Sequence, residues 1–338
     1  MDGYLGIDVG SVSTNLVLMN EDSEILVSLY LRTRGQPIQV VQEGLKEIGH
    51  KMPSGIDIRG VGTTGSARYL TGVVVGADVV KNEITAHAVA ANLVVPGVQT
   101  VLELGGQDSK IIVLRHGVVS DFAMNTVCAA GTGSFLDHQA ARLGIPIEQF
   151  GEIALRSKHP VHIAGRCSVF AESDMVHKQQ VGYSTEDIIA GLCDALVRNY
   201  LNNVGKGKDI QPPIIFQGGV AANVGIKNAF EKALEQEVIV PEEFAVMGAL
   251  GAALLSRSAA KKRSATGVTK FRGFELSDFN YETSSFECRG CPNICEIVNI
   301  HMEGELLARW GSRCGKWDSL AEVDPAQLEP ADSLVGKP

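Results

Sequence analysis

The chain has 338 residues, of which 45% are hydrophobic and 37 are glycine, so it can bury a large core and form more than one lobe. Its net charge of -9, with only 20% charged residues, excludes the basic surface that nucleic-acid binding needs. The N-terminus lacks a signal-peptide pattern and no apolar run is long enough to cross a bilayer. We therefore expect a cytoplasmic protein with neither nucleic acid nor membrane as a partner.

The start of the chain predicts a strand, a glycine turn, a second strand, a polar turn and a third strand, and the same plan returns at residue 100. Aligning the two copies places Asp8 opposite Glu103 and Thr14 opposite Ser109. The turn residues are Gly10, Ser11, Ser13 and Thr14 in the first copy and Gly105, Gly106, Gln107 and Asp108 in the second. We predict an α/β fold of two duplicated lobes, at residues 1–98 and 99–257.

Helical patterns fill the intervals between the strands. The predicted helices cover residues 37–49, 82–92, 133–143, 168–178, 185–204, 225–234 and 241–257. Because strands alternate with helices, we expect a mainly parallel or mixed sheet in each lobe, and the last helix is a candidate to pack on the first lobe. Beyond it we predict a linker at 258–285, a cysteine module at 286–317 and a disordered tail at 318–338.

Both glycine turns have the composition of a phosphate-binding turn. A glycine lets backbone N–H groups approach phosphate oxygens, and nearby hydroxyls add further donors. Asp8 and Glu103 are candidates to hold a hydrated Mg²⁺ or to orient an attacking water, with Asp108 as a second candidate. Lys110 is a candidate to neutralise phosphate charge. Ordinary hairpin turns use the same residue types, so either turn alone leaves that interpretation open.

A third segment also has the composition of a nucleotide-binding element. Residues 213–223 read as a buried strand that runs into two glycines and a helix, which suits an adenosine lying against the backbone. Its candidate contacts are Gln217, Gly218, Gly219, Val220 and Asn223. The three elements, in this order, resemble the phosphate-1, phosphate-2 and adenosine motifs of the acetate kinase, sugar kinase, heat-shock chaperone and actin (ASKHA) superfamily. The resemblance implies two lobes around an ATP/ADP cleft, with hinge segments at 60–68 and 243–253.

Two cysteines stand where helices are predicted to begin. Cys128 precedes the helical pattern at 133–143, and Cys167 precedes the one at 168–178. A helix N-terminus lowers a thiol pKa and stabilises an anionic cluster, so the pair forms half of an iron–sulfur ligand set that a symmetric dimer would complete. The alternative is that both are small buried hydrophobic residues. Cys193, on an apolar helical face, is predicted to be core packing.

The strings CAAGTGSFLD and GRCSVFAESDMV, between GGQDSK and FQGGVAAN, resemble the activators of 2-hydroxyacyl-CoA dehydratases and the ATPase subunits of benzoyl-CoA reductase, in the BadF/BadG/BcrA/BcrD ATPase family. The resemblance covers about residues 1–257 and adds Gly131 and Gly133 to the nucleotide contacts. It implies a homodimer with one interface [4Fe–4S] cluster on Cys128 and Cys167 of each chain. It also implies ATP-driven electron transfer from ferredoxin or flavodoxin to a dehydratase or reductase partner. Glu103 stands where the family more often has aspartate.

Four more cysteines, Cys288, Cys291, Cys295 and Cys314, follow in a glycine- and proline-bearing segment. Their spacing suits a tetrahedral sulfur site for zinc or an iron–sulfur cluster, and four unrelated thiols are the alternative. The segment resembles the region after the ATPase unit in large activator-like proteins, so the chain is either a stand-alone variant or a fragment. The histidines His159, His162 and His177 have no ligand spacing.

Two other functions fit the predicted fold. A small-molecule kinase would need a substrate pocket and a base, and the sequence contains no distinctive sugar-binding string. An actin- or chaperone-like nucleotide switch would act through binding alone. Neither explains cysteines at two predicted helix starts, so the sequence favours an ATPase that activates a partner by electron transfer.

Overall fold

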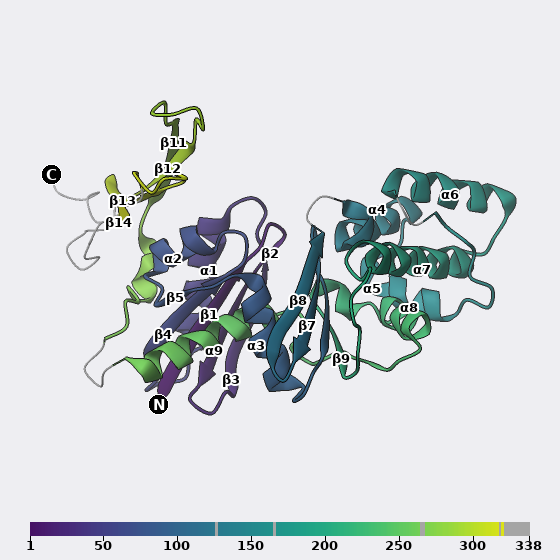
Figure 1. Ribbon diagram of the computed structural model, residues 1–338, viewed down its shortest axis with the longest axis horizontal. Coiled ribbons are helices and arrows are strands. Elements are labelled where there is room, and N and C mark those ends of the chain that lie inside the picture. Colours follow the sequence, from purple (N-terminus) through teal and green to yellow (C-terminus); the bar gives the residue numbers. More distant parts are fainter. Residues whose placement is uncertain (126–127, 165–166, 264–267, 318, 321–338) are drawn as a thin grey trace. The chain divides into compact units, whose positions relative to one another are not determined.

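The computed structural model describes residues 1–125, 128–164, 167–263, 268–317 and 319–320 (Figure 1). Apart from Ser319 and Leu320, the predicted tail lies outside the described residues, as do residues 264–267 of the predicted linker. The chain forms two compact units, one made of Met1–Asn82 with Ala252–Pro338 and the other of Glu83–Gly251. Each unit contains its own five-stranded sheet.

The first unit is built on a mixed sheet with the strand order β3-β2-β1-β4-β5. Its strands are β1 (Asp2–Val9), β2 (Ser13–Asn20), β3 (Ile25–Arg32), β4 (Asp57–Thr64) and β5 (Val79–Val80). The central strand β1 pairs antiparallel with β2 and parallel with β4. Its buried residues Leu5, Ile7 and Val9 belong to a core that also includes Leu45 of helix α1 (Pro37–Lys51) and Val74 of helix α2 (Arg68–Val75).

The second unit has a sheet with the order β10-β9-β6-β7-β8. Its strands are β6 (Thr100–Leu104), β7 (Ser109–Arg115), β8 (Val118–Asn125), β9 (Ile214–Gln217) and β10 (Val238–Ile239). Its helices are α3 (Glu83–Val94), α4 (Gly133–Leu143), α5 (Ile147–Leu155), α6 (Ser168–Val181), α7 (Thr185–Asn203) and α8 (Val224–Leu234). Helix α7 lies among α4, α5, α6 and α8 (Figure 1), and Tyr200 from it packs edge-on against Phe230 of α8 in the core.

The two sheets have the same topology, which confirms the predicted duplication. In each, the first strand of the copy pairs antiparallel with the second and parallel with the fourth, and the second pairs antiparallel with the third. The register ends at Val9 opposite Thr14 in one sheet and at Leu104 opposite Ser109 in the other. Asp8 and Glu103 therefore occupy equivalent positions, one residue from the carboxyl end of each central strand.

Most helices lie where the sequence placed them, and the differences have local causes. Helix α4 has the predicted bounds, whereas α9 (Met247–Lys262) begins six residues later than predicted and runs further, because residues 242–246 form a turn. The sequence missed α2 and α5. Each is short and has a glycine inside it, Gly72 or Gly151, which weakens the helical pattern.

The segment after α9 packs on the first unit. Beyond the residues that are not described, Phe271 and Phe274 lie against the core, and Leu276 and Phe279 are buried in it. The side-chain Nε2 of Gln42, on α1, donates to the backbone oxygens of Leu276 and Phe279 at 3.1 and 2.7 Å. Residues predicted as linker thus contribute to the core, because aromatic side chains follow the polar run and cover α1.

The cysteine-bearing region forms a small antiparallel sheet in the first unit. Its strands, in the order β11-β12-β13-β14, are β11 (Tyr281–Glu287), β12 (Glu296–Met302), β13 (Glu305–Trp310) and β14 (Ser319–Leu320). Ile300, Met302 and Leu307 are buried in the same core as the main sheet. Within the described ranges, no helix combines the length and the apolar character that a membrane span requires.

Candidate functional site

The glycine turns of the two units close with the same hydrogen bond. The backbone N–H of Gly10 donates to the oxygen of Ser13 at 2.9 Å, and that of Gly105 donates to the oxygen of Asp108 at 3.0 Å. A side-chain carbon on Gly105 would lie 2.7 Å from Asp108 Oδ1, so a larger residue here would displace the Asp108 side chain. Duplicated strands therefore carry duplicated turns, as the alignment predicted.

In the first unit the turn follows the strand that carries Asp8. Asp8 is partly exposed at the end of β1, and a side-chain carbon on Gly65, whose φ is +92°, would lie 2.6 Å from Asp8 Oδ1. Thr14 is buried, with its hydroxyl 3.0 Å from that of Thr33, which donates to the oxygen of Gly10. Thr14 thus contacts the turn through Thr33, and Ser11 and Ser13 are more exposed than Thr14.

In the second unit three glycine segments meet. The backbone N–H of Gly133 donates to the oxygen of Gly105 at 2.9 Å, so the start of α4 contacts the phosphate-2 turn. Gly133 also faces Val220: a side-chain carbon on it would lie 3.0 Å from Val220 Cγ2. Gly218, with a φ of +88°, leaves no room for a side chain between the oxygen of Leu104 and Glu103 Oε1, 2.3 and 2.7 Å away. These close approaches show that the Gly105 turn, the start of α4 and the segment after β9 pack tightly against one another.

A cluster of charged side chains surrounds Lys110 of β7 in the second unit. Lys110 is 2% exposed, and its Nζ lies 2.7 Å from Glu83 Oε2, 3.0 Å from Glu103 Oε2 and 2.9 Å from Asp108 Oδ2. Burial raises the pKa of the Glu103 carboxyl, although the Lys110 ammonium opposes the rise. Burial also disfavours the Lys110 ammonium, but the three carboxylates outweigh it and hold the lysine pKa above its ordinary range. Lys110 is therefore charged, and its ammonium faces carboxylates.

The adenosine strand is held by a second buried polar pair. Gln217 and His87 of α3 are both buried, with Gln217 Nε2 2.6 Å from His87 Nδ1. Because an amide nitrogen can only donate, Nδ1 accepts and the ring is neutral. Burial, with the nearby Lys110 charge, lowers the pKa of His87 to about 4. Gln217 Oε1 is buried and has no hydrogen-bond partner in the described part of the chain.

This histidine makes stability depend on pH. The unfolded chain takes up a proton on His87 below its ordinary pKa of 6.5, whereas the folded chain does so only near pH 4. The free energy of unfolding should therefore fall by about 3 kcal/mol from this group as the pH drops from 6.5 to 4. We expect His87→Gln to lose that much less stability over this range, as measured by urea unfolding. His50→Gln, at an exposed position on α1, is the control and should follow the wild type.

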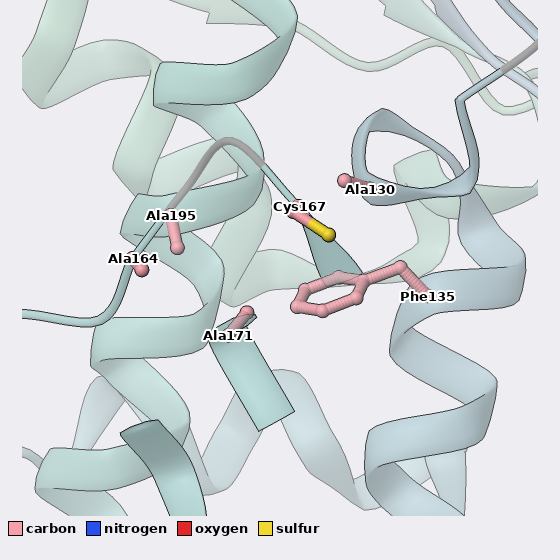
Figure 2. A pocket seen from close by; sticks show the side chains of 6 residues that line it. All are labelled: Ala130, Phe135, Ala164, Cys167, Ala171 and Ala195. Carbon is pink, nitrogen blue, oxygen red and sulfur yellow. The ribbon is translucent and has the colours of Figure 1, made fainter. Parts of the chain in front are cut away.

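The predicted cluster cysteines lie at the starts of two helical segments in the second unit. Cys128 precedes the 3₁₀ turn Ala129–Gly131, and its backbone N–H donates to Asn125 Oδ1 at 3.0 Å. Cys167 is the N-cap of α6, and the thiol projects toward Ala130 and Phe135 in a small pocket (Figure 2). Both thiols are partly exposed and free. The Cys167 side chain thus reaches the segment that carries Cys128.

Comparison with known proteins identifies the family. The BadF/BadG/BcrA/BcrD ATPase family matches residues 5–256. This chain belongs to that family. The (R)-2-hydroxyglutaryl-CoA dehydratase activating ATPase of Acidaminococcus fermentans is 35% identical over 266 residues, covering 76% of this chain and 98% of that protein.

Two solved structures are similar to this family member. The A. fermentans (R)-2-hydroxyglutaryl-CoA dehydratase component A has a TM-score of 0.71 and 33% identity, covering 78% of this chain and all of that one. The activator of the 2-hydroxyisocaproyl-CoA dehydratase from Clostridium difficile, with bound ADPNP, has a TM-score of 0.69 and 31% identity, with the same coverage. The fold class predicted from the sequence is confirmed by these similarities and by the paired sheet topologies.

The remaining cysteines of this ATPase-family chain differ from one another in their surroundings. Cys193, on α7, is 1% exposed in the core, and burial raises the pKa of its thiol, so its predicted packing role is confirmed. Cys288 lies in the C-terminal sheet region, and its Sγ accepts from Trp317 Nε1 at 3.1 Å. Hydrogen bonds to the sulfur, from the Gly290 backbone first, lower the Cys288 pKa.

The structure leaves the C-terminal metal site a prediction. Cys288 N donates to the oxygen of Cys295 at 2.8 Å, whereas Cys291 and Cys314 are exposed. Among the residues that the structure describes, no three His, Cys, Asp or Glu side chains come together as a metal site. The chain here brings two of the four cysteines close through the backbone.

Several residues that the sequence predicts for the nucleotide site have structural partners of their own. Asn223 caps α8, its Oδ1 accepting from the N–H groups of Gly225 and Ile226, and its Nδ2 is buried without a partner in the described residues. A side-chain carbon on Gly131 would lie 2.8 Å from Asn199 Oδ1, while Gln107 and Gly219 are exposed. Sequence reasoning missed Glu83 and His87. Their only local signal is a spacing of four on one predicted helix, which places both on one face.

Proposed function

We propose that this protein is an ATP-dependent activator that passes electrons from an interface [4Fe–4S] cluster to a dehydratase- or reductase-type partner in the cytoplasm, with ferredoxin or flavodoxin as donor. The observation that carries the proposal is the position of Cys167: it caps α6 and points at Ala130, two residues from Cys128, in a chain of this ATPase family. The relatives named above, a dehydratase activating ATPase and a dehydratase activator, support the same function.

The nucleotide part of the proposal fits the chain. Each glycine turn is a proposed phosphate contact, because the absence of a side chain at Gly10 in the first unit and at Gly105 and Gly133 in the second lets a phosphate approach the backbone. The adenosine would lie at Gly218 of the second unit. Asp8, which is partly exposed near the end of β1, would hold Mg²⁺ through water. Glu103 and Asp108 would orient the attacking water, because Lys110 fixes both carboxylates.

The cysteine part of the proposal fits as well. Cys128 and Cys167 are partly exposed and lie at the starts of two helical segments, where a metal cluster could reach both thiols. Two thiols are half a ligand set, so a second copy of the chain would complete it. Val169 and Phe170, directly after Cys167, are each 66% exposed and would be covered in such a homodimer. A bound [4Fe–4S] cluster would supply a one-electron centre of low potential.

The C-terminal cysteines are proposed to hold a second iron–sulfur cluster or zinc. The lowered Cys288 pKa favours thiolate, the form that binds metal. Elemental analysis of the purified protein, before and after Cys288→Ser, would distinguish iron from zinc at this place.

The proposal is tested by anaerobic purification and reconstitution with iron and sulfide. We expect a brown protein that contains about four iron and four sulfide ions per two chains in the interface cluster, apart from the metal on the C-terminal cysteines, hydrolyses ATP, and reduces a 2-hydroxyacyl-CoA dehydratase only when ATP is present. A colourless protein that phosphorylates an added sugar would contradict the proposal and support a kinase on the same fold.

A further inference from the structure

Helix α3 contacts both nucleotide-binding strands of the second unit through two side chains on one face. Glu83, its first residue, lies 2.7 Å from the ammonium of Lys110 on β7. His87, one turn later, lies 2.6 Å from Gln217 on β9. Because these two strands carry the phosphate-2 and adenosine segments, the position of α3 and the position of both segments are linked.

The contacts of Lys110 leave Glu83 a specific role. An ammonium has three N–H donors, and three carboxylate oxygens lie within 3.0 Å of this one. The Lys110 side chain is 2% exposed, so water cannot replace a lost partner easily. With Glu83 in place, Lys110 is held between Glu103 and Asp108; without it, the ammonium would be free to move toward either carboxylate or toward a phosphate.

Glu83 also marks the point where the chain enters the second unit. The first unit's N-terminal part ends at Asn82, and the chain leaves the second unit again after Gly251 on α9. These two places lie together, since a side-chain carbon on Gly251 would lie 1.9 Å from the backbone oxygen of Ala86 on α3. The helix that begins at Glu83 therefore packs backbone-to-backbone on the helix in which the chain returns.

We propose that Glu83 is a positioning residue for ATP hydrolysis. It holds Lys110 so that Glu103 and Asp108 keep their places at the phosphate-2 turn. Through α3, the two carboxylates are thereby connected to the place where the chain enters the second unit. This rests on the ATPase part of the proposed function and not on the iron–sulfur cluster. In this proposal Lys110 positions the two carboxylates and does not contact the phosphates directly. A shift of either carboxylate during hydrolysis would then move the start of α3.

The test compares Glu83→Gln with the wild type in steady-state ATP hydrolysis. Glutamine keeps the shape but removes the charge that competes for Lys110, so we expect kcat to fall about tenfold while KM for ATP changes less than about threefold. Glu83→Asp keeps the charge and should recover much of the kcat. Glu148→Gln, an exposed acidic residue in the first turn of α5, is the matched control and should leave both constants unchanged.

A double mutant separates positioning from general stability. If Glu83 acts through Lys110, the kcat of Glu83→Gln combined with Lys110→Met should equal that of Lys110→Met alone within about twofold. The inference would be overturned if the double mutant's loss of kcat equalled the product of the two single losses. It would also be overturned if Glu83→Gln kept the wild-type kcat, or if neither Glu83 variant folded. A wild-type chain that hydrolyses no ATP would instead overturn the proposed function, so the two failures are distinguishable.

Discussion

Replacing Cys167 by serine is expected to give a folded chain that binds ATP but, after anaerobic reconstitution, lacks the roughly four iron ions per two chains of the interface cluster, because a neutral hydroxyl is a far weaker ligand than thiolate. The helix should tolerate the change. Cys167 is the N-cap of α6 with extended backbone angles, and serine is among the preferred residues at that position. Visible absorption and iron and sulfide content are the measurements, and Cys128→Ser should give the same result.

Cys193→Ser is the matched control for this experiment. The thiol of Cys193 is buried among apolar side chains of the second unit, so a hydroxyl there should lower the free energy of unfolding by about 1–3 kcal/mol. The iron content should nevertheless stay at the wild-type value. If Cys167→Ser kept its full iron and Cys288→Ser lost it, the metal would belong to the C-terminal cysteines, and the interface cluster would be refuted.

The parts of the fold that follow from local patterns were predictable. Repeated strand–turn–strand segments in the sequence indicated the duplication. The equivalence of Asp8 with Glu103 followed from their spacing alone. The start of α6 directly after Cys167 was predicted as well. These features depend on residues close together in the chain, where turn residues and apolar periodicity act directly.

The parts that depend on distant contacts were not predictable. Nothing near Glu83 indicates that Lys110 will be its partner, since strand β6 and a turn separate them in the sequence. The sequence placed α3 in the first lobe, whereas it belongs to the second compact unit, because its polar face bonds to β7 and β9. Likewise, a polar run suggested a linker, but Leu276 and Phe279 beyond it are buried against α1.

Gly251→Ala is expected to lower the free energy of unfolding by about 3 kcal/mol or more, because the added carbon would lie 1.9 Å from the oxygen of Ala86 and 2.5 Å from its carbonyl carbon. Both atoms are backbone, so no side chain can rotate away. Helices α3 and α9 would have to separate, and the Glu83 and His87 contacts would be strained with them. Urea unfolding measures the loss, and ATP binding should weaken in parallel.

Gly49→Ala is the control that shows what the same substitution does where space exists. Gly49 also lies within a helix, α1, but a carbon there would meet only the Phe274 side chain at 3.4 Å. Alanine has the higher helix propensity, so stability should be unchanged or rise by about 0.5–1 kcal/mol. If Gly251→Ala matched this control, α3 and α9 would not be in close contact in solution, and a link from Lys110 through α3 to the returning chain would lose its physical basis.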